Sequence, residues 1–196
     1  MLYLSEYDSP LGKITLGSNG EALTALWLPG QTCTEKLLSA QHEYAEVPAI
    51  SEAKRWLDIY FSGKEPDFFP ALAPEGTAFQ LEVWNLLRQI PYGKTTTYGA
   101  LAAEAAKRRG KEKMSAQAVG NAVGSNPISI IVPCHRVVGA SGSLTGYNGG
   151  IKYKTALLKL EGGYSDKFFV PEKGNRLMAY GGHGVVVYLQ QRMRFL

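Results

Sequence analysis

A segment rich in proline and glycine, GKEPDFFPALAPEG at residues 63–76, divides the chain of 196 residues into two parts of different charge. Residues 1–74 carry 5 Lys and Arg against 10 Asp and Glu, a net charge of −5, whereas residues 75–162 carry 11 against 5, a net charge of +6. This asymmetry indicates that the second part meets a polyanion, with a solvated basic face as the alternative. We therefore expect one domain over 1–74, a second over 75–162, and an extension of unknown role over 163–196.

The first part has the pattern of a small α/β domain. Between residues 1 and 29, the turn sequences SPLG and SNGE separate short runs rich in apolar and β-branched residues, which predicts an antiparallel meander. Residues 49–62 then place Ala53, Trp56 and Tyr60 at helical spacing. We expect the apolar stripe of this helix to cover the small sheet.

The second part is predicted to be mainly helical. Thr77 and Gln80 form a capping-box pattern ahead of an apolar helical run. Residues 95–97 can cap a second helix, and Ser115 can cap a third after the basic segment KRRGKEK at 107–113. The last two helices, joined by that loop, form a candidate helix-turn-helix.

The third of these helices has almost no side-chain bulk. Its small residues are Ala116, Ala118, Gly120, Ala122 and Gly124. Glycine destabilises a helix by roughly 0.5–1 kcal/mol relative to alanine, so these positions need a reason. Either the backbone approaches a partner closely, or the helix packs tightly against another helix.

Cys134 lies between Pro133 and His135, directly after an apolar run at 128–132 that predicts a buried strand. Free cysteines are often buried and inert, which is the simplest alternative for Cys134. An imidazole within direct or water-mediated reach can take the thiol proton and leave a nucleophilic thiolate. The adjacent His135 therefore favours a reactive cysteine.

A carboxylate is available to orient that histidine. The helix predicted to start near Ile151 places Lys154, Leu157, Leu158 and Glu161 on one stripe. A carboxylate on a core-facing stripe is costly unless it is paired. We expect Glu161 to pair with His135, and the alternative is a helix end that frays into water.

Composition argues against several classes of protein. Cys33 and Cys134 lie about a hundred residues apart and belong to no metal-binding spacing, and the chain has only three histidines, so we expect neither a disulfide framework nor a metal site. No apolar run approaches the roughly 18 residues of a membrane span, and the N-terminus lacks a signal-peptide pattern. These features predict a soluble cytoplasmic protein without a membrane partner.

Together these segments resemble the 6-O-alkylguanine-DNA alkyltransferase family of direct-reversal repair proteins. The resemblance is weak over the first 75 residues and close afterwards. It rests on three stretches, which are GTAFQLEVWNLLRQIPYGKTTTYGALA at 76–102, AVGNAVGSNP at 118–127 and PCHRVVGASGSLTGYNGGIKYKTALLKLEG at 133–162. It implies a ribonuclease-H-like α/β N-terminal domain followed by a mainly α, winged-helix-like C-terminal domain.

The resemblance also implies a function. A monomer would bind double-stranded DNA through the minor groove and flip the alkylated guanine out of the stack. Cys134 would then accept the methyl or alkyl group from the 6-oxygen, with no cofactor. Because the thioether product offers water no carbonyl to attack, each molecule would react once. Activity on the 4-oxygen of thymine is left open.

Roles for individual residues follow from the matched motifs. His135 would deprotonate Cys134 through a water and Glu161 would orient His135. Tyr98 would hydrogen-bond the guanine, and Asn126 would brace the turn before the active site. The pocket set is Tyr147, Asn148, Val137 and Gly149. The DNA-contact set is Ser115, Gln117, Ala118, Asn121, Thr95, Lys107, Arg108, Arg109 and Arg136.

Two features depart from the family pattern. Gln117 stands where many members carry an arginine that fills the space left by the flipped base. Because glutamine brings no charge, we expect base extrusion or its salt dependence to differ. The loop at 107–113 is longer and more basic than in compact members, and we expect its lysines and arginines, Lys111 and Lys113 included, to add phosphate contacts unless the loop is only solvated.

Three other functions fit part of the pattern. A cysteine hydrolase would use Cys134 and His135 but would turn over repeatedly on an acyl substrate. A lesion-binding sensor would bind damaged DNA without transferring anything. A structural DNA-binding protein would bind regardless of damage and would tolerate loss of Cys134.

Overall fold

The structure is a computed structural model, and it describes residues 1–31 and 41–171. Cys33 and the end of the predicted extension, residues 172–196, lie outside the described residues. Within the described ranges, no helix is long and apolar enough to cross a membrane. The N-terminal part contains β1 (Leu2–Ser9), β2 (Gly12–Ser18), β3 (Leu23–Trp27), β4 (His42–Tyr44) and α2 (Pro48–Phe61).

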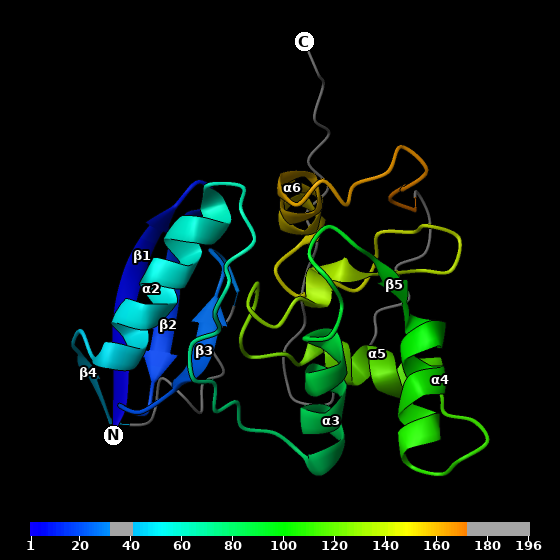
Figure 1. Cartoon of the computed structure of the whole chain (residues 1–196), viewed down its shortest axis with the longest axis horizontal. Coiled ribbons are helices and arrows are strands. Elements are labelled where there is room, and N and C mark those ends of the chain that lie inside the picture. Colours follow the sequence, from blue (N-terminus) through cyan, green and yellow to red (C-terminus); the bar gives the residue numbers. More distant parts are fainter. Residues whose placement is uncertain (32–40, 172–196) are drawn as a thin grey trace.

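The N-terminal sheet has the strand order β3-β2-β1-β4. Its first three strands form the predicted antiparallel meander, in which Tyr7 of β1 pairs with Ile14 of β2. The fourth strand was not predicted, and it pairs parallel to β1, with Leu2 opposite His42. The sheet is therefore mixed, and α2 lies across it (Figure 1).

Helix α2 covers the sheet as its sequence pattern predicts. A proline in its first turn, where no backbone donor is needed, starts the helix at Pro48. Its buried stripe includes Ala53, Trp56, Leu57 and Tyr60. These side chains belong to the main apolar core, which also contains residues of the C-terminal part.

The C-terminal part is mainly helical, as expected. Its elements are α3 (Ala78–Leu87), β5 (Thr96–Thr97), α4 (Tyr98–Arg108), α5 (Ala116–Gly124), the 3-10 turn η1 (Cys134–Arg136), β6 (Val137–Val138) and α6 (Ile151–Leu160). Figure 1 shows α3, α4 and α5 grouped together beside the N-terminal sheet, with α6 apart from them. The two-residue strands β5 and β6 pair in parallel.

The helix starts carry the caps that the sequence predicts. Thr77 and Gln80 form a reciprocal capping box, with the Thr77 amide donating to Gln80 Oε1 at 2.8 Å and the Gln80 amide donating to Thr77 Oγ1 at 3.3 Å. Thr97 accepts from the amide of Ala100 at the start of α4. Ser115 is the N-cap of α5. Local side-chain chemistry thus sets where these helices begin.

The predicted strand at 128–132 is wrong. This stretch is a tight turn in which the Val132 amide donates to the Ile128 carbonyl at 3.1 Å and Ile130 has a positive φ of 68°. All five of its residues are buried. An uninterrupted apolar run shows burial but not conformation, so it did not distinguish a strand from a buried turn.

The open edge of β3 joins the two parts of the chain. At one end of the strand, Leu23 exchanges two hydrogen bonds of 2.8 Å with Ala71 and Ala73, which belong to the segment at 63–76 that divides the sequence. At the other end, Leu26 accepts from the Ser129 amide and donates to the Pro127 carbonyl. Covering an edge in this way satisfies backbone groups that would otherwise be exposed.

The beginning of the extension packs onto the C-terminal part, which the sequence did not suggest. The Leu144 amide donates to the Phe169 carbonyl at 2.8 Å. Tyr164 and Phe168 pack against a cluster formed by Val138, Leu144 and Leu158. The strand-like sequence GVVVYLQ at 184–190 lies outside the described residues.

The capping box makes a stability prediction. Replacing Thr77 by alanine removes an N-cap acceptor from α3, and we expect the free energy of unfolding to fall by about 1 kcal/mol. Urea denaturation of Thr77→Ala measures the change. The matched control is Thr155→Ala, which removes a hydroxyl from the middle of α6 and should cost no more than a few tenths of a kcal/mol. Equal losses in the two variants would contradict a capping role for Thr77.

Candidate active site

Asn126 links the end of α5 to the cysteine. Its side-chain amide donates to the carbonyls of Ile128 at 3.2 Å and Val132 at 2.8 Å, and it lies 3.2 Å from Cys134 Sγ. Its oxygen accepts from the Ile128 amide. One side chain therefore bonds to both ends of the buried turn and contacts the sulfur.

Cys134 begins the short turn η1, and only 7% of its surface is exposed. Burial raises the pKa of its thiol, while the hydrogen bond from Asn126 and the charge of Lys154 oppose that rise. The sulfur is thus a thiol at rest and requires a base to become a thiolate.

His135 and Glu161 form the pair that the sequence predicts. His135 Nε2 lies 2.8 Å from Glu161 Oε1, and both side chains are fully buried. Burial lowers the pKa of His135, although the carboxylate opposes this change. With the Nε2 proton shared with Glu161, Nδ1 carries the lone pair of the neutral ring. In the described part of the chain, Nδ1 has no hydrogen-bond partner, so it is available as a base.

Arg136 lies elsewhere than expected. It was predicted to contact DNA, but it is 8% exposed and its guanidinium donates to both carboxylate oxygens of Glu161, from Nε at 2.8 Å and from Nη2 at 2.9 Å. Its Nη1 donates to the Ile90 carbonyl. Burial by itself would raise the pKa of Glu161, but the hydrogen bonds and charges of His135 and Arg136 outweigh it and lower that pKa to about 2.

Two further residues complete the surroundings of Glu161. Gly93 donates its amide to Glu161 Oε2 at 3.3 Å, and it has a φ of +68° that favours glycine. Tyr60 donates its hydroxyl to Oε1 at 2.7 Å. Sequence reasoning assigned neither residue to the site, because both contacts join segments that are far apart in the chain.

Lys154 is a buried cation near the sulfur. It is fully buried, and its Nζ donates to the carbonyls of Val137 at 2.5 Å and Thr145 at 3.0 Å. Burial lowers its pKa to about 8, and the charge of a Cys134 thiolate opposes this change. Its place on the stripe with Leu157 and Leu158 was the signal that it points inward.

Of the predicted pocket residues, Val137 belongs to β6, and Tyr147, Asn148 and Gly149 lie on the loop that follows it. Val137 and Tyr147 are buried, whereas Asn148 is exposed and Gly149 is half-buried. Tyr98 donates its hydroxyl to the Thr145 carbonyl at 3.1 Å, so it lies beside this loop.

Helix α5 divides its small residues between two faces. Gly120, Ala122 and Gly124 are buried, and the Trp84 indole of α3 donates to the Ala122 carbonyl at 2.7 Å. Tight helix packing therefore explains these three. Ala116 is exposed and Ala118 is half-exposed.

The predicted DNA contacts lie on more than one surface. Ser115, Gln117 and Asn121 are exposed on α5, and Thr95 lies half-buried just before β5. The predicted basic loop is shorter than expected, because α4 continues through Lys107 and Arg108. Lys107, Lys111 and Lys113 are exposed.

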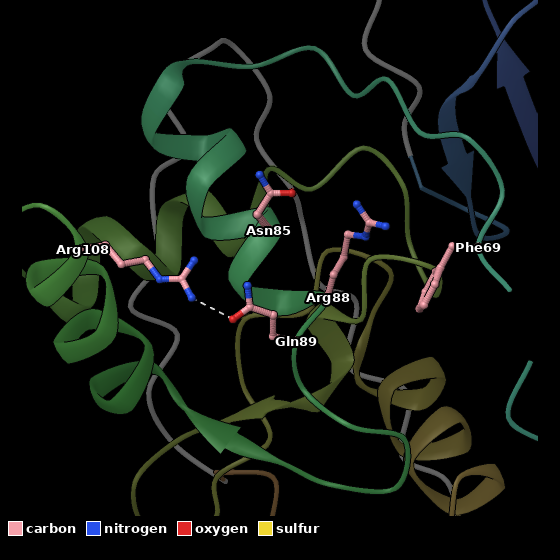
Figure 2. Close-up of a pocket in the computed structure, with 5 residues that line it drawn as sticks. All are labelled: Phe69, Asn85, Arg88, Gln89 and Arg108. Carbon is pink, nitrogen blue, oxygen red and sulfur yellow. Dashed lines mark hydrogen bonds between the residues drawn. The ribbon is translucent and has the colours of Figure 1, made fainter. Parts of the chain in front are cut away.

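Arg108 and Arg109 reach back toward α3. Arg108 donates to Glu104 at 3.0 Å and to Gln89 at 2.8 Å, and Arg109 pairs with Glu82 at 2.6 Å. Figure 2 shows the Arg108 side chain extending across a surface hollow of about 460 Å³, which is also lined by Phe69, Asn85 and Arg88. This hollow contains none of the predicted catalytic residues.

The residues around Cys134 provide a nucleophile and a base but no cluster of metal ligands. Among the residues that the structure describes, no three His, Cys, Asp or Glu side chains are placed to hold a metal ion. The arrangement of Cys134, His135 and Glu161 suits proton removal from a thiol and attack by its sulfur. It follows α4 and α5, the two helices of the candidate helix-turn-helix.

Comparison with known proteins identifies the class. Residues 2–73 match the 6-O-methylguanine DNA methyltransferase ribonuclease-like domain, and residues 78–163 match the DNA binding domain of the same family. The chain belongs to the 6-O-methylguanine DNA methyltransferase family. The predicted fold class is therefore confirmed.

Individual relatives are similar over most of their length. The methylated-DNA–protein-cysteine methyltransferase of Methanosarcina acetivorans is 46% identical over 163 residues, which cover 82% of this chain and 99% of the relative. The protein of the same name from Mycobacterium tuberculosis H37Rv is 45% identical over 161 residues, covering 82% and 93%. The crystal structure of Mycobacterium tuberculosis OGT in complex with DNA matches with a TM-score of 0.71 at 44% identity, covering 82% of this chain and 92% of that one.

The contact between Gly93 and Glu161 can be tested by adding one methyl group. A Cβ at Gly93 would lie 2.6 Å from the Glu161 carbonyl, whereas a Cβ at Gly110, whose φ is +62°, would meet no atom within 4 Å. Both alanine variants bear the backbone cost of a positive φ, so we expect Gly93→Ala to lose about 1–3 kcal/mol more stability than Gly110→Ala. Thermal and urea denaturation measure both. Equal losses of stability would show that the close contact between Gly93 and the Glu161 carbonyl does not exclude a side chain at position 93.

The ion pair of Glu161 predicts acid sensitivity. Its pKa is lowered from 4.5 to about 2 in the folded protein, so the pair stabilises the fold above pH 4.5 and this contribution is lost as the pH falls toward 2. Glu161→Gln should be less stable at neutral pH, because Arg136 is left buried without its anion. Its free energy of unfolding should also fall less steeply below about pH 5 than that of the wild type. The control is Glu75→Gln, at an exposed carboxylate. A Glu161→Gln profile parallel to the wild type would refute the prediction.

Proposed function

We propose that this protein repairs DNA by direct reversal, moving a methyl or larger alkyl group from the 6-oxygen of guanine to Cys134. The observation that carries the proposal is the buried grouping of Cys134 with Asn126 on its sulfur and with the His135–Glu161 pair next to it. Membership of the family and the printed names of the relatives support the same reaction.

The protein and the damaged base together supply every group and proton that the proposed reaction needs. The thiol proton passes to Nδ1 of His135 through a water molecule, and the sulfur attacks the alkyl carbon. As the new carbon–sulfur bond forms, the carbon–oxygen bond breaks and guanine leaves with the electron pair, accepting a proton from a nearby donor such as Tyr98. Asn126 and Lys154 stabilise the thiolate, by hydrogen bond and by charge respectively. No co-reactant is needed, and the stable thioether limits each molecule to one transfer.

We propose that α5 enters the minor groove of double-stranded DNA. Its exposed residues Ser115, Gln117 and Asn121 support this docking, and the flipped base would enter the pocket near Tyr147. In this proposal Gln117 fills the gap left by the base. Lys107, Lys111 and Lys113 would add phosphate contacts, while Arg108 and Arg109 would have to leave their carboxylate partners to do so.

We propose different roles for the successive parts of the sequence. Residues 75–162 would bind DNA and carry the nucleophile as a monomer, and residues 1–74 would form the supporting domain. The role of residues 163–196 lies outside this proposal, although Tyr164 and Phe168 pack against the apolar cluster that contains Leu144.

The test is transfer of a labelled methyl group. Incubated with DNA that carries a radiolabelled methyl on guanine oxygen, the protein should gain label up to one per molecule and then stop. Cys134→Ser should gain none, and the matched control Cys33→Ser should react like the wild type. A duplex that carries a radiolabelled methyl on the 4-oxygen of thymine, run in parallel, shows whether thymine lesions are also substrates.

Other outcomes would identify the rival functions. Release of free label with repeated turnover would indicate a hydrolase, and tight binding of the lesion without label would indicate a sensor. Equal binding of intact and damaged DNA without transfer would indicate a structural DNA-binding protein. Each of these results would overturn the proposed transfer.

A further inference from the structure

The active-site carboxylate is contacted by a residue of the N-terminal part that lies 101 positions earlier in the chain. Tyr60 lies in the last turn of α2, and its hydroxyl donates to Glu161 Oε1 at 2.7 Å, the oxygen that also faces His135 Nε2. We propose that Tyr60 is a positioning residue for the transfer reaction, acting through Glu161 to hold His135 as a neutral base. The inference rests on the proposed function, and it makes the N-terminal domain part of the catalytic apparatus.

The surroundings of the Tyr60 ring aim its hydroxyl at the carboxylate. The side chain is fully buried. Its ring stacks on Trp56 with centroids 5.1 Å apart and meets Phe61 and Tyr92 edge to face at 5.4 and 6.0 Å. Trp56 and Phe61 belong to α2 itself, and Tyr92 belongs to the C-terminal part, so the ring is packed within its own helix and across to the other part. The hydrogen bond is therefore fixed by packing between the two parts of the chain.

The hydroxyl is a permanent donor. Burial, together with the charge of Glu161 and the hydrogen bond to it, raises the pKa of Tyr60 well above its ordinary value. Across the physiological range Tyr60 thus stays protonated and shares the negative charge of Glu161. A carboxylate that accepts more hydrogen bonds is less basic, and it stabilises a neighbouring imidazolium less.

The consequence concerns His135, which must be neutral to accept the thiol proton. Removing the Tyr60 hydroxyl would leave more negative charge on Oε1, so the imidazolium would become more stable and the pKa of His135 would rise. The other charged or titratable groups around the pair would be unchanged by this substitution. They are Arg136, Lys154, Cys134, Tyr92 and Tyr147.

Tyr60→Phe and Tyr92→Phe form a matched pair of variants. Both keep the ring and remove one buried phenol oxygen, but Tyr92 Oη has no hydrogen-bond partner among the described residues. Single-turnover methyl transfer is measured from about pH 5 to pH 9 for each. We expect the acid limb of the Tyr60→Phe profile to move up by about 0.5–1 pH unit, which slows the reaction roughly 3- to 10-fold on that limb. Tyr92→Phe should follow the wild type.

A second readout does not depend on activity. The imidazole of His135 can be titrated by NMR in protein labelled with ¹⁵N-histidine, with its signal assigned by a His135→Gln variant. The midpoint should rise in Tyr60→Phe and stay in place in Tyr92→Phe. If Tyr60→Phe does not fold, 3-fluorotyrosine incorporated at position 60 gives the opposite test, because a more acidic phenol donates more strongly and should lower the midpoint.

The two proposals fail in different ways. If the wild type transfers no methyl group, the proposed function fails, but the histidine titration still decides the role of Tyr60. If the wild type transfers methyl and Tyr60→Phe gives the same pH profile and the same titration as Tyr92→Phe, the inference is overturned. A merely structural role would lower stability or the amount of active protein without moving either midpoint.

Discussion

The rest of this structure depends on the hydrogen bonds and the ion pair that the buried carboxylate of Glu161 makes. The carboxylate is fully buried, and it accepts hydrogen bonds from Tyr60, from His135 and Arg136, and from the backbone of Gly93. These donors come from α2, from η1 and from the turn before β5. A buried charge that loses its ion-pair partner typically costs about 3–5 kcal/mol, so the contact with Arg136 matters most, and the other donors tie α2 and the turn before β5 to the same carboxylate.

The nucleophile Cys134, by contrast, is positioned by contacts between residues that are close in the sequence. Asn126 follows α5 by two residues, and its side chain holds the turn that ends at Cys134. The same turn pairs with β3 through Ser129. The helix proposed to read the groove, the sulfur and the edge of the N-terminal sheet are therefore connected through this one turn.

Sequence patterns predicted the local features well. The caps at Thr77 and Ser115 and the buried stripe of α2 depend on spacing within one helix, which the sequence displays directly. The pairing of His135 with Glu161 could be inferred because a carboxylate on an apolar stripe needs a partner. The inward turn of Arg136 could not, since nothing in PCHRV distinguishes an arginine that binds DNA from one that neutralises a carboxylate 25 positions away. The turn at 128–132 and the strand β4 were missed for a related reason, because both are decided by long-range packing.

The arrangement of the two parts converts a difference in composition into a separation of charge in space. The segment with a net charge of −5 lies beside the segment with a net charge of +6, as Figure 1 shows for their described residues. Such a molecule has an electric dipole, and near a polyanion it experiences a torque as well as an attraction. The torque turns the basic part forward before any contact is made, so fewer encounters begin in the wrong orientation. Because salt screens this field beyond about 8 Å at physiological ionic strength, added salt should reduce the alignment of the approaching molecule as well as its attraction.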